Sequence, residues 1–241
     1  MIKLDGVCFA YKDTVALRDI NLEIKDGESV ALIGPNGSGK STFLKVINGL
    51  VSPNKGSFIF DGEEVTHKKL ENNSFSKNFH KRVGFIFQNS DAQLFCSTVY
   101  EEIAFGPRQM GLPEEEVDKR VNDCLEILNI TELKERQPYN LSGGEKKKVA
   151  IASVLSLNPD VLVLDEPMNE IDPKGKRFLR DFLKKLNESG KTLICSTHEF
   201  GYVEGVFKRA IVFSSDHKVI RDGDYHEILS DKEFLEKHNI L

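Results

Sequence analysis

The residues from Val30 to Ser41 read VALIGPNGSGKS, and they decide the fold. A short apolar run, Val30 to Ile33, leads directly into a glycine-rich loop that ends in Lys40-Ser41. The residues that follow, Thr42 to Gly49, fit a helix. A buried strand, a loop of the pattern G-x-x-x-x-G-K-S and a helix, in this order, form a phosphate-binding unit. The stretch therefore predicts a nucleotide site on an α/β sheet.

The chemistry of this loop suits a nucleoside triphosphate. Its glycines let backbone N–H groups turn inward around phosphate oxygens, and the helix N-terminus adds positive potential. Lys40 is expected to reach the β- and γ-phosphates, and Ser41 to offer its hydroxyl to Mg²⁺. The loop alone leaves kinases, GTPases, helicases and transporters open, because a fold does not determine a function. The predicted nucleotide-binding residues of the loop are Gly34, Pro35, Asn36, Gly37, Ser38, Gly39, Lys40, Ser41 and Thr42.

Length and composition restrict the class of protein. With 241 residues and 39% hydrophobic content, the chain can bury the core of one sizeable domain, and we expect a single domain with an inserted subdomain. No segment approaches the roughly 20 apolar residues that cross a bilayer, and the first residues do not resemble a signal peptide, so we expect a cytosolic protein without direct membrane insertion. The net charge of -5 predicts no nucleic-acid binding. The four cysteines form no C-x-x-C pair, which argues against a zinc site or a disulfide framework.

Apolar runs rich in β-branched residues recur between helical stretches and predict an α/β sheet. Between Gln88 and Ala150 this alternation stops, and the pattern predicts helices over 99–110, 113–128 and 143–157. The polar stretch from His67 to Lys81 shows no clean period and is expected to be a mobile surface connection. The expected strands are 30–33, 83–87, 161–164, 193–195 and 210–213.

A second apolar run, Val161 to Leu164, ends in Asp165-Glu166-Pro167. In an open α/β sheet, ligands sit at the carboxyl ends of the strands, so this position places two adjacent carboxylates at the nucleotide. Asp165 is expected to hold Mg²⁺, through water, and Glu166 to act as general base toward the attacking water. A solvated acidic turn is the alternative interpretation.

The residues Leu141 to Glu145 read LSGGE and are followed by Lys146 to Ala152. This segment closely resembles the signature motif of ABC-type ATPases, and together with the phosphate loop and the carboxylate pair it identifies the chain as resembling that family. The resemblance spans nearly the whole chain. It implies a P-loop NTPase core with an antiparallel β part, about 1–87 and 155–241, and an inserted helical subdomain, about 88–154.

The resemblance also assigns roles to single residues. Tyr11 matches the aromatic residue that stacks on adenine, although Phe9 alternates with it on a strand and one of the two can simply pack. Gln88 matches the Q-loop glutamine, Asp172 the D-loop aspartate and His198 the switch histidine. The implied catalytic residues are Lys40, Gln88, Glu166 and His198, and the implied Mg²⁺ ligands are Ser41, Gln88 and Asp165.

In this family two subunits face each other head to tail, and the signature of one caps the nucleotide of the other. The resemblance therefore implies that Ser142, Gly143, Gly144 and Glu145 act in trans, in a homodimer or in a heterodimer with a sister ATPase. A Ser-Gly-Gly turn that opens a helix presents N–H donors to an anion, which supports the assignment. A merely N-capped helix is the alternative.

The stretch from Gln88 to Phe95, with Ala104-Phe105-Gly106-Pro107 further on, resembles the ATPases of energy-coupling-factor importers, including the cobalt and nickel systems. Those systems import vitamins or transition-metal ions. The resemblance implies integral membrane subunits as partners and a peripheral position at the cytoplasmic face of the membrane. The residues expected to dock the membrane subunit are Asp91, Gln93, Leu94 and Phe95.

The sequence departs from the subfamily pattern at three places: Ser90 stands where proline is usual, Glu145 replaces glutamine, and the D-loop reads Asn169-Glu170-Ile171-Asp172. None of these changes removes a catalytic group, but the D-loop leaves the choice of dimer partner open. A soluble ABC ATPase that acts on DNA or ribosomes is the second hypothesis, although the chain lacks coiled-coil heptads and a second phosphate loop. A P-loop kinase or GTPase leaves the signature motif unexplained. The resemblance implies that the membrane subunits or a separate binding protein select the transported substrate.

Overall fold

The phosphate-binding loop follows a central strand of a six-stranded sheet in the computed structural model, which describes residues 1–241. The strand order is β10-β9-β3-β8-β7-β6, with β10 antiparallel to β9 and the other neighbours parallel. The strands β3, β7 and β8 are buried along their whole length, as expected for parallel strands covered on both faces. The α/β prediction and all five expected strands are confirmed. The strands are β3 (Ser29–Ile33), β6 (Val83–Ile86), β7 (Val161–Asp165), β8 (Thr192–Ser196), β9 (Arg209–Phe213) and β10 (Val219–Asp224).

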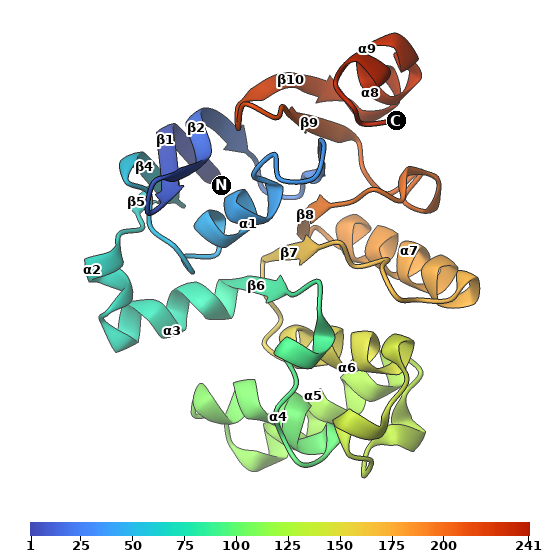
Figure 1. Ribbon diagram of the computed structural model, residues 1–241. Coiled ribbons are helices and arrows are strands. Elements are labelled where there is room, and N and C mark those ends of the chain that lie inside the picture. The colour runs from blue at the N-terminus through green and yellow to red at the C-terminus, as the bar shows by residue number, and fades with distance from the viewer.

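A second sheet is antiparallel, in the order β2-β1-β4-β5. Helix α1 (Lys40–Ile47) shares one apolar cluster with residues of both sheets, and Figure 1 shows it between β1 and β2 on one side and β7 on the other. The first helical turn after the phosphate loop is therefore held from two sides. The strands are β1 (Ile2–Tyr11), β2 (Thr14–Ile24), β4 (Lys55–Phe60) and β5 (Glu63–Glu64).

Three helices form a separate group between β6 and β7 along the chain: α4 (Val99–Gln109), α5 (Glu114–Ile127) and α6 (Gly143–Leu155). Figure 1 shows them together on one side of the six-stranded sheet, below β6 and α7. Their apolar side chains belong to the same buried cluster as Ala31, Leu162 and Leu164 of the sheet. The three helices are those that the sequence predicts.

Four short 3₁₀ turns lie in the connections. They are η1 (Ser90–Ala92) between β6 and α4, η2 (Thr131–Leu133) and η3 (Pro138–Asn140) between α5 and α6, and η4 (Phe200–Tyr202) after β8. Helix α7 (Pro173–Glu188) lies beside β8 and η4, and the C-terminal helices α8 (Tyr225–Ser230) and α9 (Lys232–Lys237) follow β10. Asp231 is the N-cap of α9, and Leu235 of this helix is fully buried. None of the helices is long and apolar enough to cross a membrane.

The expectation of an irregular connection over 67–81 is wrong. The segment forms α2 (His67–Leu70) and α3 (Asn73–Arg82), each with an N-cap side chain that accepts a backbone hydrogen bond. The rings of Phe75 and Phe79 stack one turn apart, and Phe79 is buried against Phe58 and Phe60. Two aromatic residues at a spacing of four anchor the helix, although the residues between them are polar.

Candidate functional site

The glycine-rich loop is a tight cradle at the N-terminus of α1. Gly39, the residue before the helix, has φ 105°, and a Cβ there would lie 2.2 Å from the carbonyl oxygen of Ala16. A Cβ on Gly34 would lie 2.5 Å from the carbonyl oxygen of Phe213. No side chain caps the first turn of α1. The N–H groups of this turn are therefore available to an anion, which the helix dipole favours.

Lys40 places its charge inside this cradle. Its Nζ donates hydrogen bonds to the carbonyl oxygens of Gly34 at 2.7 Å and Pro35 at 3.0 Å, and the residue is buried. Burial lowers the pKa of Lys40, while Glu166 and Asp165 oppose the shift. The hydroxyl of Ser38 is buried without a hydrogen-bond partner, which suits an incoming phosphate oxygen.

Asp165, the last residue of β7, is buried and joins two strands to the helix. Its Oδ1 accepts hydrogen bonds from Ser41 Oγ at 3.1 Å and from Ser196 Oγ at 2.5 Å. Carboxylate and hydroxyl oxygens are ligands of the kind that Mg²⁺ prefers beside a nucleotide phosphate. The residues at this point thus fit the predicted ion. Ser196 is a residue that the sequence analysis did not select, although it directly follows a predicted strand.

Glu166 lies at the centre of a group of polar side chains. Its φ is +44°, an unusual backbone conformation for a residue with a side chain, and its N–H donates to Ser196 O at 3.1 Å and to Ser196 Oγ at 3.0 Å. His198 Nε2 is 3.5 Å from Glu166 Oε1, and Gln88 Nε2 is 3.5 Å from Glu166 Oε2. The amide of Asn169 also donates to Oε2. Residues from three separate segments therefore converge on one carboxylate.

The surroundings of His198 favour its neutral form. Burial and the nearby charge of Lys40 lower the pKa of His198, and Glu166 partly opposes them. The neutral imidazole can donate one hydrogen bond and accept another near neutral pH. Asn169 belongs to the unusual D-loop, and the motif by itself does not predict its contact with Glu166.

One pocket of about 690 Å³ brings most residues of the predicted nucleotide site together, whereas Gly34, Pro35 and Asp165 do not line it. Tyr11, Gln88, Glu166 and His198 line it together with residues 36–42 of the loop. The ring of Tyr11 is 44% exposed and packs edge-on against the buried Phe9 at 4.8 Å between centroids, so Tyr11 is the aromatic residue that faces the pocket. His217, from the turn between β9 and β10, is a lining residue that the sequence did not reveal.

The signature turn lies elsewhere on the chain. Ser142 is the N-cap of α6, and its hydroxyl and N–H both donate to Glu145 Oε2, at 2.7 and 2.8 Å, in a capping box. These donors lower the pKa of the Glu145 carboxyl. Ser142, Gly144 and Glu145 line a different cavity, of about 560 Å³ between α6 and α7, together with Asp172, the N-cap of α7. The chain therefore does not bring its own signature turn to its own phosphate loop.

The four predicted docking residues behave differently from one another. Phe95 is 67% exposed and packs edge-on against Phe105, whereas Leu94 packs against the buried core. Asp91 is paired with Lys146 of the same chain at 2.6 Å. Gln93 is turned inward: its amide donates to the carbonyl oxygen of Ala150 at 2.9 Å and accepts from the N–H of Phe87. Gln93 thus serves the internal packing of the chain.

The sequence as a whole is similar to known ATP-binding proteins. Residues 17–169 match the family model described as ABC transporter. A putative ABC transporter ATP-binding protein of Clostridium acetobutylicum is 66% identical over 100% of both chains. The nickel import ATP-binding protein LarO of Lactiplantibacillus plantarum is 45% identical, over 92% of each chain. The energy-coupling factor transporter ATP-binding protein EcfA of Methanococcus maripaludis is 41% identical, over 96% of this chain and 82% of the relative.

Solved structures agree with the fold and with the sequence relatives. CbiO1 from Clostridium perfringens, described as part of the ABC transporter complex CbiONQ, matches with a TM-score of 0.84 and 36% identity over 99% of this chain and 94% of its own. A dimeric ATP-binding cassette in a post-hydrolysis state, bound to ADP and Pi, matches with a TM-score of 0.84 and 32% identity over 93% of this chain and 98% of its own. With the nucleotide pocket and the signature turn in place, the chain belongs to the ABC transporter family, as an ATPase that resembles the energy-coupling-factor and cobalt–nickel members.

Proposed function

We propose that this ATPase works as one half of a pair and drives an energy-coupling-factor importer for transition-metal ions, cobalt or nickel, or for vitamins. The observation that carries the proposal is the separation of two half-sites on one chain. The pocket around Lys40 and Glu166 gathers the phosphate loop and the hydrolytic groups, while the signature turn at Ser142 lines a different cavity. A second subunit is needed to bring the two halves together.

Within the pocket each residue has a distinct task. Lys40 and the loop N–H groups hold the phosphates, Tyr11 stacks on the base, and Glu166 polarises the attacking water as general base. His198, whose Nε2 is 3.5 Å from Glu166 Oε1, acts at the γ-phosphate. Mg²⁺, when bound, neutralises phosphate charge, and Ser41, Asp165 and Gln88 are the residues that would hold it.

The dimer supplies the remaining contacts to the nucleotide. Ser142, Gly143 and Gly144 of one subunit would meet the phosphates in the pocket of the other, with Glu145 beside them and Asp172 at the same face. The dimeric cassette with ADP and Pi supports this arrangement, since it aligns over most of the chain. The partner is a second copy of this chain or a sister ATPase.

The surface around Phe95 is the proposed contact with the membrane subunit. Phe95 and Phe105 form an exposed aromatic pair whose ring centroids are 5.0 Å apart, with Leu94 beneath them. Aromatic side chains of this kind anchor protein interfaces. Asp91, which already pairs with Lys146, would add a charged contact to a basic side chain of the partner's helix. This docking would place the ATPase at the cytoplasmic face of the membrane.

The transported substrate is inferred from the relatives. One relative is named for nickel import, another for the energy-coupling factor, and a solved structure belongs to the CbiONQ complex. The nickel-import name supports a transition-metal ion as substrate, and a vitamin is the alternative that the resemblance to energy-coupling-factor importers implies. The membrane subunits would select between them. The same relatives speak against an ATPase that acts on DNA or ribosomes, and no observation on this chain favours that alternative.

Co-expression with candidate membrane subunits of an energy-coupling-factor importer, followed by reconstitution into vesicles, tests the proposal. We expect ATP-driven accumulation of Ni²⁺, Co²⁺ or one vitamin, and loss of co-purification when Phe95 is replaced by Asp. Ile127→Asp is a matched control, because Ile127 is also an exposed apolar residue, 55% exposed, on the same helical group. An active ATPase that binds no membrane subunit, or equal effects of both substitutions, would contradict the proposal.

A further inference from the structure

Lys147 is a buried lysine that no part of the ATPase mechanism above uses. It lies in the second turn of α6, and only 2% of its surface is exposed. Its Nζ donates to the carbonyl oxygen of Phe87 at 3.0 Å and to the carbonyl oxygen of Gln88 at 2.7 Å. Burial lowers the pKa of Lys147 to about 8, although Glu170 and Asp165 oppose the shift. Burying an ammonium is costly, so this arrangement calls for a functional explanation.

Two further side chains join the same pair of segments. Gln93 accepts a hydrogen bond from the N–H of Phe87 and donates to the carbonyl oxygen of Ala150 on α6. The N–H of Phe87 is therefore linked to α6 through Gln93, and its carbonyl oxygen is linked to α6 through Lys147. Asp91 pairs with Lys146, the neighbour of Lys147. The segment from Phe87 to Gln93 is therefore attached to α6 by side chains, besides its covalent continuity with β6.

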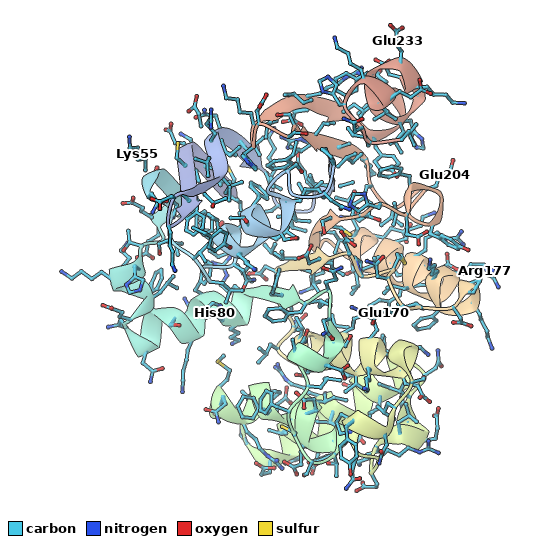
Figure 2. All side chains as sticks on the ribbon, viewed as in Figure 1. Lys55, His80, Glu170, Arg177, Glu204 and Glu233 are labelled. Atoms are coloured by element: carbon cyan, nitrogen blue, oxygen red, sulfur yellow. The ribbon has the colours of Figure 1, made fainter.

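The two ends of this connection lie at functionally different places. The N-terminus of α6 is the signature turn, which begins at Ser142. At the other end, the side chain of Gln88 reaches toward Glu166, with 3.5 Å between Gln88 Nε2 and Glu166 Oε2. Figure 2 shows Glu170 between α7 and α6, and a Cβ on Gly143 would lie 3.2 Å from the carbonyl oxygen of Glu170, so α6 also abuts the D-loop.

We propose that Lys147 is a positioning residue that transmits the position of α6 to Gln88, so that hydrolysis at Glu166 depends on where the signature turn lies. A shift of α6 would move the backbone carbonyl of Gln88 with it. The distance between the side-chain amide of Gln88 and the carboxylate of Glu166 would then change. The proposal rests on the proposed role of Gln88 at the nucleotide. Lys147 would hold Gln88 in that role through its hydrogen bond to the Gln88 carbonyl oxygen.

The chemistry of the side chain fits this task. An ammonium has three donors and no acceptor, so it can hold two carbonyl oxygens at once and is attracted to both dipoles. Methionine has a similar length and is apolar, and it would fill the space without holding either carbonyl. A merely structural role would make the loss of Lys147 appear as lower stability or weaker nucleotide binding.

The first experiment compares Lys147→Met with Lys148→Met in steady-state ATPase assays of the full chain. Lys148 is the next residue on the helix and packs over Phe178, without a hydrogen bond to the Gln88 segment. We expect Lys147→Met to lower kcat about 10-fold with KM within about 2-fold, because the nucleotide cradle is untouched. Lys148→Met should leave kcat near the wild-type value. Lys147→Arg, which can donate to both carbonyls, should recover most of the loss.

The second experiment places Lys147→Met in a Gln88→Ala background. If Lys147 acts through Gln88, the double variant should have a kcat less than about 2-fold below that of Gln88→Ala alone. If the two residues act independently, the two losses of kcat multiply. A full additional 10-fold loss, or an equal loss of stability and of nucleotide affinity, would overturn the proposal. If Gln88→Ala itself leaves kcat unchanged, the assignment of Gln88 fails first, and the connection fails with it.

Gln93→Ala serves as a second variant if Lys147→Met does not fold. It removes the contacts from the Gln93 side chain to Phe87 and to Ala150, and it leaves the lysine in place. We expect a smaller loss of kcat, about 3-fold, again nearly absent beside Gln88→Ala. An unchanged kcat in this variant would count against the connection.

Discussion

Two glycine-rich turns open helices in this chain, and they differ in what satisfies their N–H groups. The turn before α1 has no side-chain cap and encloses Lys40 and the unpartnered Ser38 hydroxyl. The turn before α6 is capped by its own residues, Ser142 and Glu145, and is exposed. Both turns have the same elementary geometry, a helix N-terminus that attracts anions. We propose that the first is a complete phosphate site within one chain, whereas the second needs a partner to become one.

The environment of the two turns explains this difference. The loop before α1 is closed in by Ala16 and Phe213 of neighbouring strands, which leave no room for a Cβ on Gly39 or Gly34. Around Gly144, by contrast, a Cβ would meet nothing within 4 Å. Glycine is needed at the first turn by the chain itself. At Gly144 of the second turn the structure of one chain gives no such reason, whereas a Cβ on Gly143 would lie 3.2 Å from the carbonyl oxygen of Glu170. The proposed approach of a second molecule supplies the reason at Gly144.

The largest expected effect lies in the complete site. Glu166→Gln removes the general base and leaves the cradle intact, so turnover should fall about 10²-fold or more while ATP affinity is kept. Single-turnover hydrolysis together with equilibrium binding of labelled ATP measures both quantities. As a contrast, Lys40→Ala should weaken ATP binding itself, because Lys40 lies inside the cradle. Near-normal turnover of Glu166→Gln would refute the base assignment.

A substitution at the exposed turn should affect only the pair of subunits. In a Glu166→Gln background, Gly144→Val should weaken ATP-dependent dimer formation about 10-fold, because the side chain would stand where the partner's nucleotide is proposed to bind. Thermal stability and ATP affinity of the monomer should be unchanged. Light scattering over a range of protein concentrations gives the dimer affinity. Gly39→Ala is the opposite control and should reduce stability and ATP binding in the monomer, since its Cβ would overlap Ala16 O at 2.2 Å. Equal behaviour of the two variants would remove the distinction between the turns.

Glu145 gives the exposed turn a negative charge close to where phosphates are proposed to dock. Glu145→Gln keeps an acceptor for the N–H and hydroxyl of Ser142 but loses the charge, so ATP-dependent dimers should be about 3-fold tighter at low salt. The gain should shrink as ionic strength rises. Sedimentation of the Glu166→Gln background at several salt concentrations measures it. A weaker dimer at low salt would show that the charge assists docking.

The smallest effect concerns pH in the complete site. The pKa of His198 is lowered by burial and by Lys40, so between its folded value and about 6.5 the unfolded chain binds more protons than the folded one. Stability should therefore decline as pH falls through this window, and turnover should drop about 2-fold as His198 becomes charged beside Glu166. His198→Gln should flatten both profiles. Thermal unfolding and ATPase rates from pH 5 to 8 check this, and unchanged profiles in the variant would contradict it.

Much of the nucleotide pocket could be predicted because its residues are close together along the chain. The phosphate loop occupies consecutive residues, and Asp165 and Glu166 directly follow an apolar run. Strand, loop and helix signals at such places depend on local chemistry alone. The helix over 73–82 was missed because its two anchoring residues, Phe75 and Phe79, stand among polar neighbours, and only the packing against β4 shows their importance.

By itself the sequence determined the fold class, the order of the elements and the chemistry of the cradle, since these follow from motifs and apolar runs of a few residues. Only the tertiary structure decided which side chains meet: Gln93 and Lys147 with the peptide groups of residues 87 and 88, Asp91 with Lys146, and Asn169 with Glu166. The contacts of Asp91 and Lys147 join residues 55 to 60 positions apart along the chain. No local pattern specifies such pairs, because each depends on how β6, α6 and the sheet pack together in space.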